Sequence, residues 1–169
     1  MAASPPSAPV AGGRTSLWRW ILLTVVVLIA GLFIGAQMGL LAGKRPLRLG
    51  VTDGQLQPVR SQLSNAVSST ATTDYHRIAP LSGGTSAKAS FERLRGVVAA
   101  MPGATIVVDQ PDYLYAEFQS RIWRFVDDVE FLLDEPAGVI EVRSASRLGR
   151  KDFGVNRTRI ESIRSSLAH

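Results

Sequence analysis

Charged, hydroxyl and glycine residues are concentrated in one run of the sequence, from Arg143 to Arg164. The run reads RSASRLGRKDFGVNRTRIESIR, and three acids, Asp127, Asp128 and Glu130, precede it. Guanidinium, hydroxyl and amide donors beside a helix N-terminus are suited to binding phosphate or carboxylate. Carboxylates close to the same arginines would instead form ion pairs inside the fold. The run therefore has two chemical interpretations, an anion-binding site and a structural polar network.

Ten residues make up this candidate site. They are Asp127, Asp128, Glu130, Arg143, Ser144, Ser146, Arg147, Asp152, Asn156 and Arg157. The anion-binding interpretation uses the serines, the asparagine and the arginines as donors. The network interpretation pairs the arginines with the acids, while Gly149 and Gly154 shape the connection between them. Clusters of interacting charges are often structural, so we favour the network.

Residues for catalysis or metal binding are scarce. The sequence contains no cysteine, which excludes disulfides, thiolate catalysis and cysteine-ligated zinc. Its two histidines, His76 and His169, are too few for a histidine-rich metal site. A hydrolase would have to combine Ser144 or Ser146 with His76 and Asp127, but no G-x-S-x-G motif or fixed triad spacing supports this. We therefore expect no catalytic residue, no metal and no cofactor.

The candidate site needs a scaffold, and the pattern over residues 86–169 predicts an α+β domain. Ser86 is a typical N-cap for a helix that ends at Pro102-Gly103. Four strands are expected at about 106–108, 113–118, 125–134 and 139–146. An amphipathic helix with Asn156 as its N-cap closes the domain. The expected architecture has two layers, a four-stranded antiparallel meander flanked by two helices.

The last two strands have a well-specified register. If Asp134 pairs with Val139, the apolar residues of both strands share one face, and a slip of one residue would break this pattern. The opposite face then pairs Glu130 with Arg143, an ion pair of about 0.2–1 kcal/mol if it is exposed.

The same register places Asp127 on the apolar face, opposite Ser146. A carboxylate in that position needs hydrogen bonds or a cation to offset its desolvation. The candidates for the cation are Arg147, Arg157 and Arg159. Four aromatic residues, Tyr113, Tyr115, Trp123 and Phe125, could line a pocket. Aromatic residues that alternate along strands are usually core, however, and this is the expectation here.

An uncharged stretch of 23 residues runs from Trp20 to Ala42. A helix of this length spans a hydrocarbon core of roughly 30 Å. A cleaved signal peptide fits less well, because the run exceeds an h-region of about 7–15 residues and no clean A-x-A site follows it. We predict an uncleaved single-pass anchor over residues 17–43, after a disordered tail over residues 1–16. Basic residues flank both ends, so charge does not assign the orientation.

Glycine recurs every fourth residue in the second half of this stretch. The positions are Gly31, Gly35, Gly39 and Gly43. On one helix they would form a slowly drifting stripe, at which a second helix could approach closely and form a homo-oligomer. The other interpretation is that glycine is simply common in membrane helices.

The net charge of +5 comes from the N-terminal part of the chain. Residues 1–49 carry five basic side chains and no acid, whereas residues 50–169 hold the remaining 14 basic residues against all 14 acids. A nucleic-acid-binding domain needs an unbalanced basic face to displace counterions from phosphates. The balanced second part therefore argues against nucleic acid as a partner.

Residues 44–85 are rich in proline, glycine, serine and threonine, and no helical or alternating pattern persists there. We predict an extended linker that is partly packed on the domain through Tyr75, Ile78 and Leu81.

Two segments carry a resemblance to a known family. FVDDVEF at residues 125–131, followed by VRSASRLGRKDFGVNRTRIE at residues 142–161, resembles the signature of the family called domain of unknown function 1499. The similarity covers about residues 54–167. The family has no assigned activity, so the resemblance implies a fold and a location rather than a mechanism.

The chain departs from the family pattern upstream of these segments. The family segment that ends in Asn-Cys-Val-Ser-Ser is similar to residues 65–69, where Ala66 replaces the cysteine. Val59 stands where another cysteine occurs in the family. A cysteine-dependent role in relatives therefore does not transfer to this chain.

Together these observations predict a membrane-tethered domain that is a non-catalytic interaction module or binds a small anionic ligand. The alternative is a small enzyme that acts on a phosphorylated or carboxylated substrate. The expected partner is the lipid bilayer, and the sequence identifies no protein partner. From the anchor and the resemblance, we expect the bacterial inner membrane, with the soluble domain in the periplasm.

Overall fold

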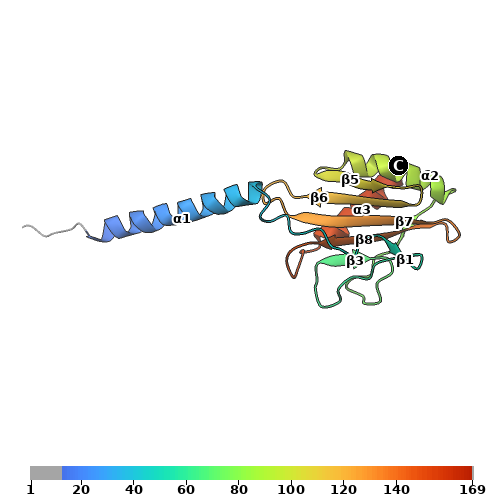
Figure 1. Ribbon diagram of the computed structural model, residues 1–169, viewed down its shortest axis with the longest axis horizontal. Helices are drawn as coiled ribbons and strands as arrows, with labels where there is room; N and C mark the ends of the chain where they lie inside the picture. The colour runs from blue at the N-terminus through green and yellow to red at the C-terminus, as the bar shows by residue number, and fades with distance from the viewer. Residues whose placement is uncertain (1–12, 169) are drawn as a thin grey trace, which may run out of the picture.

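The computed structural model describes residues 13–168 of the chain (Figure 1). In chain order its elements are α1 (Gly13–Gln37), β1 (Val51–Thr52), β2 (Gln55–Leu56), β3 (Ala66–Ser68), β4 (Leu81–Ser82), α2 (Ala87–Ala100), β5 (Ala104–Asp109), β6 (Tyr113–Gln119), β7 (Val126–Asp134), β8 (Val139–Ser146) and α3 (Val155–Leu167). The fold is α+β, as predicted: a long apolar N-terminal helix is followed by an antiparallel sheet with two helices against it.

Helix α1 is long and apolar enough over Ser16–Gln37 to cross a membrane, which is consistent with an anchor or a signal sequence. The helix ends at Gln37, earlier than the predicted anchor at residue 43. Gly39 has a φ of 87°, its N–H donates to Ala36 O at 3.0 Å, and Leu40 N–H donates to Gly35 O at 3.1 Å. This pair of bonds around a left-handed glycine is the Schellman motif that terminates helices.

The expected stripe of four glycines is therefore wrong in its second half. Gly39 stops the helix, and Gly43 lies beyond it with a φ of 69°. A side chain at Gly43 would meet the Arg147 Cβ at 2.8 Å, so this glycine allows the chain to pass close to the domain. Of the four glycines of the expected stripe, Gly31 and Gly35 lie within α1.

Strands β5 to β8 form the predicted antiparallel meander. The sheet is larger than four strands, because β3 pairs with one end of β8 and β4 pairs with the other end. Both strands come from residues 44–85, where the sequence indicates no regular element. A strand of two or three residues is too short to produce an alternating pattern, which explains why the sequence does not reveal it.

Helices α2 and α3 pack on one face of the sheet and enclose the main hydrophobic core. Its largest fully buried side chains include Phe91, Leu94, Phe131, Ile160 and Ile163. Ser86 caps α2 as predicted, and its side chain accepts a hydrogen bond from Ala89 N–H at 3.2 Å. Of the three linker residues expected to pack on the domain, Ile78 and Leu81 are buried, whereas Tyr75 is half exposed.

The β7–β8 hairpin has the predicted register throughout. Asp134 pairs with Val139, Glu130 pairs with Arg143, and Asp127 pairs with Ser146. The alternation of apolar and polar residues in both strands therefore determines which side chains face α2 and α3 and which face the other side of the sheet.

The second face of the sheet is covered in part by residues 44–57, which we call the strap. Leu56 of β2 is buried against Tyr113, Tyr115 and Leu132 of the sheet. Arg45 pairs with Glu117 at 2.5 Å. The segment that joins α1 to the domain is thus held by apolar and charged contacts, so it shields polar residues of the sheet from water.

Candidate functional site

The candidate residues lie on both faces of the sheet. The strap-face cluster consists of Tyr113, Tyr115, Glu117, Asp128, Glu130, Arg143 and Arg147. The helix-face cluster consists of Asp127, Ser144, Ser146, Asp152, Asn156 and Arg159. Side chains alternate between faces along a strand, so Asp127 and Asp128 point in opposite directions. Nine of the ten residues proposed from the sequence therefore belong to two separate clusters, and the tenth, Arg157, belongs to neither.

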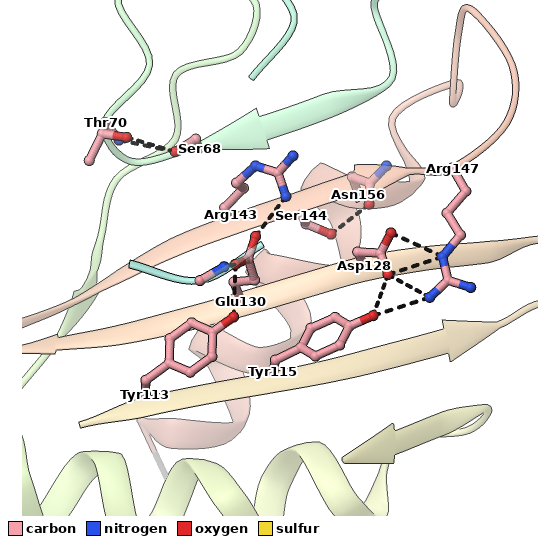
Figure 2. A network of polar contacts seen from close by, with 11 residues as sticks. Ser68, Thr70, Tyr113, Tyr115, Asp128, Glu130, Arg143, Ser144, Arg147 and Asn156 are labelled. Atoms are coloured by element: carbon pink, nitrogen blue, oxygen red, sulfur yellow. Dashed lines mark hydrogen bonds and ion pairs between the residues drawn. The ribbon is translucent and has the colours of Figure 1, made fainter. Parts of the chain in front are cut away.

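Glu130 is fully buried in the strap-face cluster, and both of its oxygens have partners. Oε2 accepts from Arg143 Nη1 at 2.7 Å, which confirms the predicted ion pair in a buried rather than an exposed setting. Oε1 accepts from the Tyr113 hydroxyl at 2.8 Å and from the Gly50 N–H of the strap at 2.6 Å. Figure 2 shows the two side-chain contacts. The carboxylate therefore joins three parts of the chain.

Asp128 binds Arg147 through a two-pronged contact (Figure 2). Arg147 Nε donates to Oδ2 at 3.0 Å and Nη2 donates to Oδ1 at 2.7 Å. Nη2 also lies 2.6 Å from Glu117 Oε1, and the Tyr115 hydroxyl donates to Asp128 Oδ1 at 2.6 Å. Bidentate arginine–carboxylate pairs fix both position and orientation. The Arg147 side chain is only 6% exposed, so it offers little surface to a ligand.

The environment of this cluster favours fixed protonation states. Desolvation, together with the nearby carboxylates, raises the pKa of Tyr113 and of Tyr115, so both phenols remain donors at ordinary pH. Desolvation acts to raise the pKa of Glu117, but hydrogen bonds from Arg147, Arg45 and Tyr115 outweigh it and hold this pKa below its usual range. Within the strap-face cluster, the carboxylates are therefore already paired with arginines and with tyrosine hydroxyl donors.

Asn156 is the centre of the helix-face cluster and is fully buried. Its Oδ1 accepts from the Ser144 hydroxyl at 2.5 Å and from Arg159 Nη1 at 2.8 Å. Its Nδ2 donates within 3.1 Å to Asn65 O, Ser146 Oγ and Asp152 Oδ2. One amide therefore connects α3 with β8 and with the residue preceding β3.

The predicted role of Asn156 as the N-cap of the last helix is wrong. The cap position is Gly154, with a φ of 84° and no side chain to cap with. Asp152 supplies the missing acceptor: its Oδ1 accepts from Gly154 N–H at 3.1 Å, and its Oδ2 accepts from Asn156 N–H at 3.0 Å. The N-terminus of α3 is therefore occupied by a carboxylate of the chain itself.

Asp127 takes its cation from Arg159, one of the three arginines that the sequence suggests. Arg159 Nη2 lies 2.5 Å from Asp127 Oδ2, and the guanidinium carbon lies 4.7 Å from the centre of the Phe118 ring. Arg147 serves the opposite face, and Arg157 donates to the backbone carbonyls of Tyr75 and Arg77. The donors proposed for one anion site thus do not converge.

His76 is buried and both of its ring nitrogens are engaged. Nε2 lies 2.7 Å from Leu63 O, and Nδ1 lies 2.6 Å from Thr73 Oγ1. Because a carbonyl only accepts, Nε2 carries the proton and Nδ1 accepts from the threonine. The histidine ties residues 63–76 together, and no lone pair is left for a serine nucleophile.

A large groove opens beside the helix-face cluster, with a volume of about 1110 Å³. It is lined by the α2–β5 turn, the end of β6, the β6–β7 loop, the β8–α3 loop and the first turns of α3; we call it the end groove. Its charged lining residues are Arg121, Arg124, Lys151, Arg159, Asp127 and Asp152. Both acids are already bound within the helix-face cluster, so the free charge of the groove is positive.

One family matches the chain. The family model described as Protein of unknown function (DUF1499) matches residues 58–167, more than half of the chain. The chain belongs to the DUF1499 family. No curated protein and no solved structure matches the chain. The matched DUF1499 region contains the sheet, α2 and α3, whereas α1 and the strap precede it.

Sequence reasoning missed three basic residues of the DUF1499 domain that form no ion pair among the described residues. Arg121, Arg124 and Lys151 line the end groove, but the sequence does not single them out. Trp123 and Phe125 were expected in the core, whereas both are more than a third exposed. The available signal was the spacing of bases and aromatics in Ser-Arg-Ile-Trp-Arg-Phe, which lies between two strands and outside their alternation.

Proposed function

We propose that this DUF1499 protein is a membrane-tethered, non-catalytic domain that binds a small anionic and partly apolar ligand in the end groove. The observation that carries the proposal is the contrast between two sets of cations. Arg143, Arg147 and Arg159 are committed to buried carboxylates. Within residues 13–168, no ion pair engages Arg121, Arg124 or Lys151.

The shape and lining of the groove support a ligand of mixed character. The end groove exceeds the roughly 300–1,000 Å³ of typical small-molecule sites. Phe125 and Leu148 contribute exposed apolar surface, and the free guanidinium groups are suited to a phosphate or carboxylate.

Two observations support binding without catalysis. The serine hydroxyls of the helix-face cluster are both hydrogen-bonded to Asn156. The ring nitrogens of His76 are bound to Thr73 and Leu63. A nucleophile needs a free base within hydrogen-bond reach, and these candidates are already used by the fold.

The tether is supported by α1, which has the length and composition of a membrane-crossing helix. We propose that it remains attached, in a bacterial inner membrane, with the DUF1499 domain in the periplasm. Fusing alkaline phosphatase or green fluorescent protein to the C-terminal end tests the orientation. Phosphatase activity together with a dark fluorescent fusion supports the periplasm, and the reverse pattern excludes it.

Calorimetry on the full chain in phosphatidylcholine nanodiscs tests the ligand proposal. Phenyl phosphate is the probe, and benzyl alcohol is its uncharged counterpart. We expect binding of phenyl phosphate only, weakened about tenfold or more by Arg121→Ala with Arg124→Ala. The control is Lys88→Ala, an exposed cation at the start of α2. Equal binding by the double variant and the control would refute the groove as the site.

A further inference from the structure

Two loops lie at the end of the sheet from which α1 departs. They are the β6–β7 loop, residues 120–125, and the β8–α3 loop, residues 147–154. Gln37, the last residue of α1, donates through Nε2 to Ile122 O at 2.9 Å. Gly43 passes against Arg147 and Leu148 of the second loop. Figure 1 shows α1 leaving the domain at this end, in line with the long strands.

The two loops expose an unusual set of side chains. Large apolar residues point outward: Phe153 is 93% exposed, Ile122 is 58% exposed and Trp123 is 38% exposed. Basic residues are interspersed among them, and these are Arg121, Arg124, Arg150 and Lys151. The acid of these loops, Asp152, directs its carboxylate to backbone N–H groups of α3. The surface is therefore both apolar and cationic.

The backbone of both loops adopts conformations that glycine would accept more easily. Arg124 has a φ of 59° and Phe153 has a φ of 55°. Left-handed backbone disfavours residues with a Cβ, and such outliers cluster where side chains serve a function. Arg124 and Phe153 therefore occupy two positions at which glycine would adopt the observed backbone conformation with less strain.

We propose that these two loops dock on the anionic surface of the same bilayer that holds α1. Aromatic and aliphatic side chains insert at the level of the headgroups, and the basic side chains bind lipid phosphates. The end of α1 sets the position of this surface, because a crossing helix that ends at Gln37 brings the bilayer to Ile122. This proposal rests on the tether in the proposed function and does not depend on a ligand in the end groove.

Tryptophan fluorescence measures this docking in the full chain. The protein has three tryptophans, so Trp18→Phe with Trp20→Phe leaves Trp123 as the single reporter. The double variant is reconstituted in vesicles whose acyl chains are brominated near the headgroup. We expect Trp123 emission to fall about twofold in phosphatidylglycerol vesicles and much less in phosphatidylcholine vesicles. Emission that is unquenched in both vesicles would overturn the proposal.

Variants separate docking from folding. Phe153→Gly removes an exposed ring at a left-handed position, so it should reduce the quenching while the melting temperature stays unchanged or rises. Arg121→Glu with Arg124→Glu should abolish the preference for anionic lipid. Lys88→Glu is the matched control, because Lys88 is an exposed cation at the start of α2 and belongs to neither loop. Quenching in the charge-reversed protein equal to that of the control would contradict a role for the basic residues.

Flotation of the vesicles at high pH distinguishes the possible failures. If the protein is stripped from vesicles by carbonate, the tether fails, and the docking proposal falls with it. If the protein floats but Trp123 is unquenched, the tether stands and docking alone is refuted. The surface of the two loops would then be available to bind a protein partner instead.

Discussion

Asp127 and Asp128 are consecutive residues of β7, yet their carboxylates lie on opposite faces of the sheet and bind different arginines. Asp127 binds Arg159 of α3 at 2.5 Å, and Asp128 binds Arg147 of the β8–α3 loop at 2.7 Å. The period of two along a strand separates them. The run Arg143–Arg164 is therefore divided between two polar clusters, which stabilise the two sides of one sheet.

Arg147 is expected to tolerate substitution by lysine less well than Arg143. Arg147 contacts both oxygens of Asp128 and also reaches Glu117, and a lysine amine cannot reproduce this fork. Arg143 contacts Glu130 through Nη1 alone, and its Nε is buried without a hydrogen-bond partner among the described residues. We expect Arg147→Lys to cost about 1–3 kcal/mol of unfolding free energy and Arg143→Lys less than about 1 kcal/mol.

Urea unfolding of the full chain in nanodiscs measures both variants. Removal of the whole side chain in Arg147→Ala should be worse, about 3–5 kcal/mol, because Asp128 would remain buried without its cation. An Arg147→Ala protein with an unchanged urea midpoint would contradict the structural role of the strap-face cluster.

Low pH should reduce the stability of the domain, because it protonates Glu117. The pKa of this carboxyl in the folded protein lies below its ordinary value of 4.5, so the folded state prefers the charged form. The resulting stability is fully present above that value and is lost as the pH falls through the folded pKa. Glu117→Gln should therefore lower stability at neutral pH and flatten its decline below about pH 4.5. Unfolding curves at several pH values compare the two slopes, and parallel curves would contradict this assignment.

The strap should detach from the sheet when its buried side chain, Leu56, is truncated. Leu56 is 4% exposed among Tyr113, Tyr115 and Leu132, so Leu56→Ala should cost about 2–3 kcal/mol. The Gly50 amide, which donates to Glu130, should then exchange its hydrogen faster. Leu47→Ala is the matched control, since Leu47 is fully exposed in the same segment. Equal exchange at Gly50 in both variants would show that Leu56 does not hold the strap.

Replacement of Asn156 by aspartate, which has the same shape, should lower the stability of the protein. Its Nδ2 donates to Asn65 O and Asp152 Oδ2, so Asn156→Asp would place an oxygen against two acceptors in a buried site. We expect a loss of about 2–4 kcal/mol, with little change for Thr158→Ala on the exposed side of the same helix turn. Thermal unfolding compares the two variants, and a stable Asn156→Asp protein would refute the proposed hydrogen-bond directions.

The sequence predicted the parts of the fold in which a pattern repeats over many residues. The β7–β8 hairpin has eight paired positions, and every one agrees with its alternation. The Glu130–Arg143 pair follows directly from that register. The cap at Ser86 was also predictable, because it uses one side chain and its own helix.

The remaining features depend on contacts between distant residues, which no local pattern reveals. Strand β3 exists because Ala66 and its neighbours find the free edge of β8. The strap is ordered by Glu117, Glu130 and the tyrosines of β6. In α3 the capping carboxylate comes from Asp152, four residues before Asn156, the position that propensity favours. Nine of the ten candidate residues form polar contacts within the two clusters, whereas Arg157 donates to backbone carbonyls, and the sequence could not show this division.

The attached strap also limits how far the domain can travel. Between the end of α1 and Arg45 there are seven residues, Met38 to Lys44, which span at most about 25 Å when fully extended. With α1 held in a membrane, as proposed, so short a connection would keep the domain from reaching a distant partner. Under that proposal, any molecule that the domain binds would have to reach it at the lipid surface, either by diffusion within the bilayer or from the solution beside it.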